Sequence, residues 1–198
     1  GLQGLETASR GRRPDMNDTP FHVRPAVFRD AAGIVRLVRA HPEELVPRSV
    51  SDVLQNIDRF FVADANGVVG VVSWGILPEL GAAQHPSVEM KTLAVDRAWR
   101  GRGVGAALVK TALERIAELR PEQVLVVTFV PEFFRRFGFT EVSKEKFMHK
   151  LYTGCVNCTR YDNPFTCPEI AMAKPMAGAA GVEAPHASTP PLPVGPRG

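Results

Sequence analysis

The feature that most constrains this chain is a glycine-rich loop between an apolar strand and a helix, within Leu93–Leu108. Glycine recurs there at alternate positions with two arginines among them: Arg100, Gly101, Arg102, Gly103 and Gly105. Glycine removes the Cβ atom where the backbone must approach something closely. The helix that follows turns its unpaired N–H groups and the positive end of its dipole to the same point. This combination predicts a site for a phosphate or pyrophosphate.

Two common phosphate loops do not fit this spacing. A Walker loop needs Lys and then Ser or Thr at the start of the helix, where this chain has Val104, Gly105 and Ala106. The dinucleotide fingerprint needs G-x-G-x-x-G and an acidic residue ending the next strand, whereas the next strand here ends in Phe129-Val130. A tight turn that binds nothing is the remaining alternative, and two arginines in an otherwise apolar joint argue against it.

Length and composition indicate one globular domain with tails. The chain has 198 residues, of which 44% are hydrophobic, and a net charge of +3 with acids and bases interspersed. We therefore expect no nucleic-acid partner, and we interpret Arg10, Arg12 and Arg13 as a solvated tail. No apolar run approaches the roughly 18 residues of a membrane span, and the first 20 residues lack the apolar stretch of a signal peptide. We expect no membrane association and a cytoplasmic location.

Three regions are expected along the chain. Residues 1–20 are polar and without periodicity, which is typical of a disordered tail, and Met16 is a candidate natural start. Residues 21–174 should form the folded domain. Residues 175–198 are mostly Ala, Gly and Pro, which cannot bury enough apolar surface to become ordered.

Hydrophobic periodicity predicts an α/β arrangement within the folded region. Strands are expected at 21–26, 60–64, 68–74, 88–95, 123–129 and 139–148. Helices are expected after Asp30 as a cap, after the capping-box pattern at Ser49, after the glycine loop, and over 132–137. Asn66-Gly67 predicts a hairpin between the second and third strands. The order is therefore one strand, two helices, three strands, helix, strand, helix, strand.

This order and the Arg-x-x-Gly-x-Gly loop resemble the GNAT superfamily of N-acetyltransferases, whose loop binds the pyrophosphate of acyl-CoA. The resemblance implies an α/β GNAT fold, a mixed central sheet splayed between its fourth and fifth strands and flanked by helices, with acetyl-CoA as cosubstrate. Four segments narrow it to stand-alone bacterial amino-acid N-acetyltransferases of the N-acetylglutamate synthase type: 45–49, 89–95, 128–139 and 149–172.

That subfamily resemblance implies acetylation of the α-amine of L-glutamate, the first step of arginine biosynthesis, by direct transfer in a ternary complex. Two alternatives stay open: a GNAT enzyme for another amino acid or amine, and an acyl-CoA-binding sensor without catalysis. The longer synthases add an amino-acid-kinase domain for which this chain has no room, which leaves arginine regulation open. Dimers are common in the superfamily, so a homodimer is compatible with the sequence.

For acetyl-CoA, the resemblance implies contacts from the fourth strand and the loop. The aromatic cluster after the fifth strand either packs in the core or contributes one or two rings against the pantetheine or adenine. An N–H of the fourth strand would donate to the thioester carbonyl as negative charge develops on its oxygen. The expected cofactor-binding residues are Leu93, Ala94, Val95, Arg100, Gly101, Arg102, Gly103, Val104, Gly105, Ala106, Phe133 and Phe134.

Glu89 is the candidate catalytic base, because it is a carboxylate on an otherwise apolar strand near the expected splay. An ion pair with Lys91 or exposure to solvent is the alternative. For the carboxylates of an acceptor such as glutamate, the candidates are Arg48, which can bind a carboxylate bidentately, and Lys91 and Lys150. Each of these cations has a plain solvated role as its alternative.

Two further points stay open in the sequence. Many family members have a tyrosine where this chain has Phe134, so we assign no general acid; a thiol pKa of about 8.5 makes the thiolate a tolerable leaving group near neutral pH, and water or Tyr152 could suffice. The three cysteines, with His149 upstream, could bind zinc or remain buried thiols, and we assign no metal site: Cys155, Cys158 and Cys167.

Overall fold

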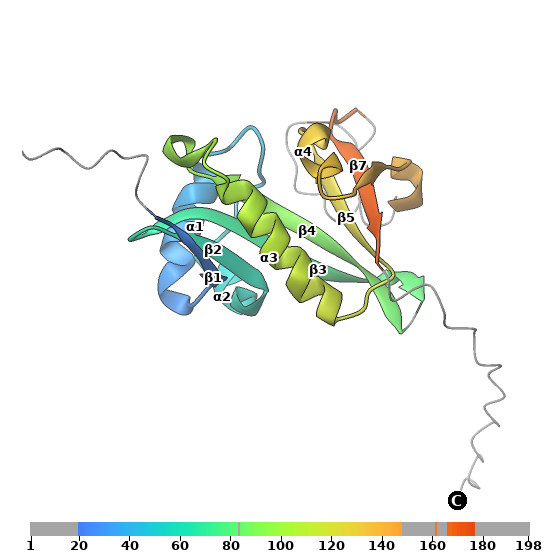
Figure 1. Ribbon diagram of the computed structural model, residues 1–198, viewed down its shortest axis with the longest axis horizontal. Coiled ribbons are helices and arrows are strands. Elements are labelled where there is room, and N and C mark those ends of the chain that lie inside the picture. The colour runs from blue at the N-terminus through green and yellow to red at the C-terminus, as the bar shows by residue number, and fades with distance from the viewer. Residues whose placement is uncertain (1–19, 83, 148–160, 162–165, 177–198) are drawn as a thin grey trace, which may run out of the picture.

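The computed structural model describes residues 20–82, 84–147, 161 and 166–176 (Figure 1). Within these residues, seven strands form one mixed sheet in the order β1-β2-β3-β4-β5-β7-β6. The strands are β1 (His22–Pro25), β2 (Phe60–Asp64), β3 (Val68–Ala82), β4 (His85–Val95), β5 (Gln123–Thr128), β6 (Thr140–Glu141) and β7 (Ile170–Pro175). The helices are α1 (Ala31–Arg39), α2 (Val50–Gln55), α3 (Val104–Glu118) and α4 (Pro131–Arg135), with 3-10 turns η2 (Phe28–Asp30), η3 (Ile57–Arg59), η4 (Arg97–Trp99) and η5 (Lys144–Phe147).

Helices cover both faces of the sheet. Side chains alternate between the two faces along each strand, so apolar residues form a core on either side. In β2, Phe61 and Ala63 pack in the core under α3, whereas Phe60 and Val62 pack in the core under α1. Figure 1 shows α3 lying across the sheet on the side opposite α1. No helix of the described residues has the length and apolar character needed to cross a membrane.

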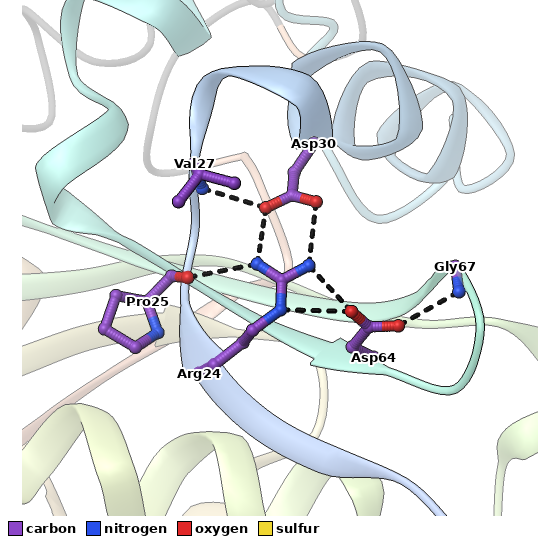
Figure 2. Close-up of polar contacts among 6 residues, drawn as sticks. All are labelled: Arg24, Pro25, Val27, Asp30, Asp64 and Gly67. Atoms are coloured by element: carbon purple, nitrogen blue, oxygen red, sulfur yellow. Dashed lines mark hydrogen bonds and ion pairs between the residues drawn. The ribbon is translucent and has the colours of Figure 1, made fainter.

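Most of the predicted elements form, and their local signals act as expected. Asn66 and Gly67 take positive φ angles of 59° and 147° and join β2 to β3 as a hairpin. The Ser49 side chain caps α2 by accepting a hydrogen bond from the backbone N–H of Asp52. The expectation that Asp30 caps α1 is wrong: its carboxylate instead binds the Arg24 guanidinium and the N–H of Val27 (Figure 2).

The end of the domain differs from the predicted single strand over 139–148. The structure has the two-residue strand β6 there, followed by η5, and the longer partner of β5 is β7. Strand β7 pairs antiparallel with β5 along its whole length and separates β5 from β6. The sequence signal for β7 is weak because Ala and a terminal Pro occupy strand positions that favour β-branched residues.

The sheet divides between β4 and β5, as the family resemblance implied. These two strands pair in parallel only at Val88 with Val124 and at Glu89 with Leu125. Beyond Glu89 the ladder between them ends, and Figure 1 shows β5, β7 and α4 diverging from β4. The backbone of β4 from Lys91 to Val95 therefore continues past its parallel partner, towards the glycine loop.

Candidate functional site

The glycine loop has the backbone of a ligand cradle. Asp96 caps the turn η4 by accepting from the N–H of Ala98, and the chain then passes through Gly101 and Gly103 with φ angles of 77° and 80°. A Cβ atom added at either glycine would meet no other protein atom within 4 Å. The left-handed backbone therefore requires these glycines, and their open side provides room for a ligand.

Helix α3 begins directly after this turn and presents its N-terminus to it. Its N-cap is Gly103, which has no side chain to bond the first N–H groups of the helix. Two cations flank the turn. The Arg102 guanidinium lies over the Trp99 ring at 4.8 Å, and Arg100 pairs with Glu44 at 3.5 Å between Nη2 and Oε1. N–H groups without a capping side chain, a positive helix end and two guanidinium groups together suit a pyrophosphate.

The aromatic residues after β5 divide between the core and the loop. Phe134 and Phe139 are buried and stack edge-to-face at 5.6 Å, so Phe134 is a core residue whose ring packs within the protein. Phe133 is half-buried, and its Cζ lies 3.5 Å from a Cβ built at Gly105 in α3. Of the two phenylalanines expected to contact the cofactor, Phe133 is the one that lies beside the start of α3.

A β-bulge interrupts β4 at the centre of the candidate site. Val71 of β3 pairs with Ala94, but Ser73 pairs with Lys91, so β4 carries one residue more than β3 across this interval. Thr92 lies in the bulge with a φ of 54°, which is a rare backbone conformation for a β-branched residue. Before the bulge, Val88 and Met90 pack under α3.

The bulge determines which way the residues of β4 face. By alternation, Glu89 and Lys91 lie on the α1 side of the sheet, opposite Val88 and Met90. A contact with β3 confirms this placement. Gly75 pairs with Glu89, and a Cβ built at Gly75 lies 3.1 Å from Lys91 Nζ. After the bulge, Leu93 and Val95 pack against the α3 core, and Ala94 packs in the α1 core.

Arg48 reaches the same side of β4 from the connection between α1 and α2. Its Nε donates to Thr92 Oγ1 at 3.0 Å, its Nη1 donates to Asp52 Oδ2 at 2.5 Å, and its guanidinium lies over the Phe60 ring at 5.7 Å. The side chain is 19% exposed. The structure thus brings Arg48, Lys91 and Glu89 to one side of β4, next to the bulge.

The remaining predicted residues are only partly described. Lys150, Tyr152, His149, Cys155 and Cys158 lie outside the described residues. The Cys167 thiol donates to the Glu169 carboxylate at 3.5 Å, and burial raises the pKa of this thiol. Within the part of the chain that the structure describes, no cluster of three His, Cys, Asp or Glu side chains could hold a metal ion.

Three residues of this region were missed at the sequence level: Asp52, Thr92 and Glu44. Asp52 could have been found as an ion-pair partner, because Arg48 and Asp52 stand at the i,i+4 spacing. No sequence signal indicates the left-handed backbone of Thr92. The Glu44–Arg100 pair joins segments 56 positions apart, which a pattern of local spacing does not reveal.

Comparison with known proteins agrees with this geometry. A family model described as an acetyltransferase (GNAT) domain matches residues 56–141. An uncharacterised N-acetyltransferase of Chlorobaculum tepidum is 34% identical over 155 residues, which span 77% of this chain and 94% of that protein. An amino-acid acetyltransferase of Mycobacterium tuberculosis is 34% identical over 133 residues, spanning 64% of this chain and 75% of that protein.

Solved structures show the same fold. A Mycobacterium tuberculosis protein in complex with CoA superposes with a TM-score of 0.64 and 28% identity, over 78% of this chain and 99% of that chain. The N-acetylglutamate synthase of Neisseria gonorrhoeae, complexed with coenzyme A and N-acetyl-glutamate, superposes with a TM-score of 0.65 over 79% of this chain and 35% of its own. At 17% sequence identity, this similarity concerns the fold alone.

Proposed function

This chain belongs to the GNAT family of acetyl-CoA-dependent N-acetyltransferases, and we propose that its acceptor is the α-amine of L-glutamate. The observation that carries this proposal is the Arg48 guanidinium, held against the bulge of β4 on the same side as Glu89 and Lys91. Arg48 and Lys91 can each meet one carboxylate of glutamate, and Glu89 can meet its ammonium group. Asp52 already pairs with Arg48 Nη1, so the acceptor would use Nη2 and the second N–H of Nη1. A relative described as an amino-acid acetyltransferase supports this class of acceptor.

On the cosubstrate side, the glycine loop would bind acetyl-CoA and the β4 backbone would polarise its thioester. The N-terminus of α3 with Arg100 and Arg102 would hold the pyrophosphate of acetyl-CoA, which supplies the activated thioester. The backbone of Leu93 and Val95 follows the bulge, beyond the last residue that pairs with β5. An N–H in this stretch would donate to the thioester oxygen as negative charge develops.

On the acceptor side, Arg48 and Lys91 would orient the amino acid and Glu89 would remove its proton. The ammonium proton passes to Glu89 directly or through a water molecule, and the amine nitrogen then bonds to the thioester carbon. The C–S bond then breaks and the thiolate leaves with the electron pair, while the second proton lost by the attacking nitrogen passes to water or to the departing thiolate. A thiol pKa of about 8.5 lets the thiolate depart near neutral pH without an assigned acid. Lys150 remains a proposed third cation.

Steady-state kinetics of Arg48→Ala with L-glutamate test this role. Loss of a charged hydrogen-bonding partner should raise the KM for L-glutamate roughly 10- to 100-fold. The Kd for acetyl-CoA should stay within about twofold. Arg59→Ala is the matched control, because Arg59 lies over the Trp74 ring, which packs under α3 on the other face of the sheet.

An unchanged KM for L-glutamate in Arg48→Ala would remove Arg48 from the acceptor site. Absence of turnover of L-glutamate by the unsubstituted protein, with acetyl-CoA bound, would remove glutamate as the acceptor. An equal effect of Arg48→Ala and Arg59→Ala would indicate a loss of folded protein rather than a lost contact.

A further inference from the structure

We propose that Thr92 is a positioning residue: its hydroxyl fixes the Arg48 guanidinium and so sets the preference of this site for acceptors with a carboxylate. This inference rests on the proposed role of Arg48 in binding the acceptor. It adds a residue that acts through Arg48. Two independent observations support it, the backbone of Thr92 and the contacts of Arg48.

The backbone of Thr92 adopts a conformation that its own side chain disfavours. Thr92 has a φ of 54° and is 9% exposed. Left-handed backbone at a β-branched residue persists only where the surroundings enforce it, and such residues concentrate at functional sites. Here the bulge between Lys91 and Ala94 enforces it. The consequence is that Thr92 Oγ1 meets Arg48, on the α1 side of the sheet.

The bond from Thr92 engages the one guanidinium nitrogen that end-on carboxylate binding does not use. In end-on binding, a carboxylate accepts from Nη1 and Nη2, the two terminal nitrogens of arginine. Nε lies away from that edge of the guanidinium. Thr92 accepts from Nε at 3.0 Å, and Asp52 accepts from Nη1, which leaves Nη2 and the second N–H of Nη1 for an acceptor carboxylate. The Phe60 ring covers the guanidinium at 5.7 Å. Together these contacts restrict the guanidinium to one orientation before any acceptor binds.

Three variants separate positioning from a general structural role. Thr92→Val keeps the β-branched shape and removes the hydroxyl, Thr92→Ser keeps the hydroxyl, and Thr92→Val combined with Arg48→Ala tests whether the two act through one contact. The measured quantities are kcat, the KM for L-glutamate and the KM for acetyl-CoA. Thermal unfolding of each variant reports whether it folds.

We expect Thr92→Val to raise the KM for L-glutamate about tenfold, in line with a lost hydrogen bond to a charged group. Its kcat at saturating L-glutamate and its KM for acetyl-CoA should stay within about twofold. Thr92→Ser should restore the KM for L-glutamate. The double variant should have the KM of Arg48→Ala alone, because without Arg48 the hydroxyl has nothing to position.

The outcomes distinguish failure of the inference from failure of the proposed function. If Arg48→Ala raises the KM for L-glutamate and Thr92→Val does not, the inference is wrong and the function stands. If neither changes it, Arg48 does not bind the acceptor and both fail. If Thr92→Val lowers kcat and raises the KM for both substrates, and Thr92→Ser does not restore these values, Thr92 has a structural role only. Should Thr92→Val not fold, Thr92→Ala provides the same comparison.

Discussion

At the scale of single residues, the acceptor side of β4 depends on a small residue across the strand pair. Gly75 of β3 pairs with Glu89, and a Cβ at Gly75 would lie 3.1 Å from Lys91 Nζ and 3.3 Å from its Cε. A side chain at position 75 would therefore displace the Lys91 ammonium. The missing side chain at Gly75 thus leaves the space over β3 into which the Lys91 side chain extends.

Glu89 is the residue whose substitution tests the chemical step. Glu89→Gln keeps the shape of the side chain and removes the proposed base, so kcat at pH 7 should fall by about 10²–10⁴-fold. At a pH above the pKa of the acceptor amine, the loss should shrink, because the amine then arrives without its proton. The measurement is the pH–rate profile of kcat, with Glu114→Gln on the exposed face of α3 as the control. An equal loss at all pH values would contradict the assignment of Glu89 as base.

At the scale of elements, one arginine joins three segments at the edge of the sheet (Figure 2). Arg24 of β1 binds both carboxylate oxygens of Asp30 before α1, at 2.6 and 2.9 Å, and Asp64 at the end of β2, at 2.7 Å. Asp64 also accepts from the N–H of Gly67 in the hairpin. The carboxylates are 7% and 18% exposed, so the Arg24 cluster is largely shielded from solvent.

The Arg24 cluster predicts a specific pH dependence of stability. Hydrogen bonds from Arg24 hold the pKa values of both Asp30 and Asp64 below their ordinary range. Below a pH of about 4 the unfolded chain takes up protons that the folded chain does not, so this stabilisation is present above pH ~4 and is lost as pH falls through the folded pKa values. At neutral pH, Asp30→Asn should lower the free energy of unfolding by about 1–3 kcal/mol.

Chemical denaturation at pH 7 and near pH 3 checks this prediction. The difference in the free energy of unfolding between the unsubstituted protein and Asp30→Asn should be large at pH 7 and smaller near pH 3. Asp58→Asn, which replaces an exposed carboxylate, is the control. A constant difference across this range would mean that Asp30 stabilises the fold by some means other than its ionised carboxylate.

Another element, the connection between α1 and α2, contacts both the glycine loop and the bulge of β4, the regions proposed to bind the two substrates. Glu44 pairs with Arg100 of the glycine loop at 3.5 Å, and Arg48 bonds to Thr92 in the bulge of β4. Both Arg100 and Glu44 are about half exposed, so this ion pair adds little stability. The connection nevertheless places Arg48, the proposed acceptor-binding arginine, four residues from Glu44, which contacts the glycine loop.

At the scale of the whole molecule, the sequence predicts the part from β1 to the start of α3 better than the end of the domain. The hairpin, the α2 cap and the glycine loop rely on residues close together in the chain, and each forms as predicted. Strand β7 is stabilised by pairing with β5 across more than 40 residues, and its own composition favours no strand. Local pattern therefore could not reveal it.

The candidate site divides in the same way. Arg48, Lys91 and Glu89 were candidates because of their residue types and their positions in the sequence. The structure places all three on one side of β4. The bulge at Thr92 was not predictable, because a strand register depends on the partner strand rather than on the residues in the bulge. Besides Asp52, the contacts that hold Arg48 come from Thr92 in β4 and Phe60 in β2, which the spacing of nearby residues does not reveal.

The central claim is that this acetyltransferase acts on L-glutamate, and a competition between acceptors tests it most directly. The purified protein would receive acetyl-CoA and an equimolar mixture of L-amino acids, with acetylated products identified by mass, because thiol reagents would also react with its three cysteines. The ratios of product give the ratios of kcat/KM. N-acetylglutamate should form fastest. A different dominant product, or none while acetyl-CoA still binds, would contradict the claim.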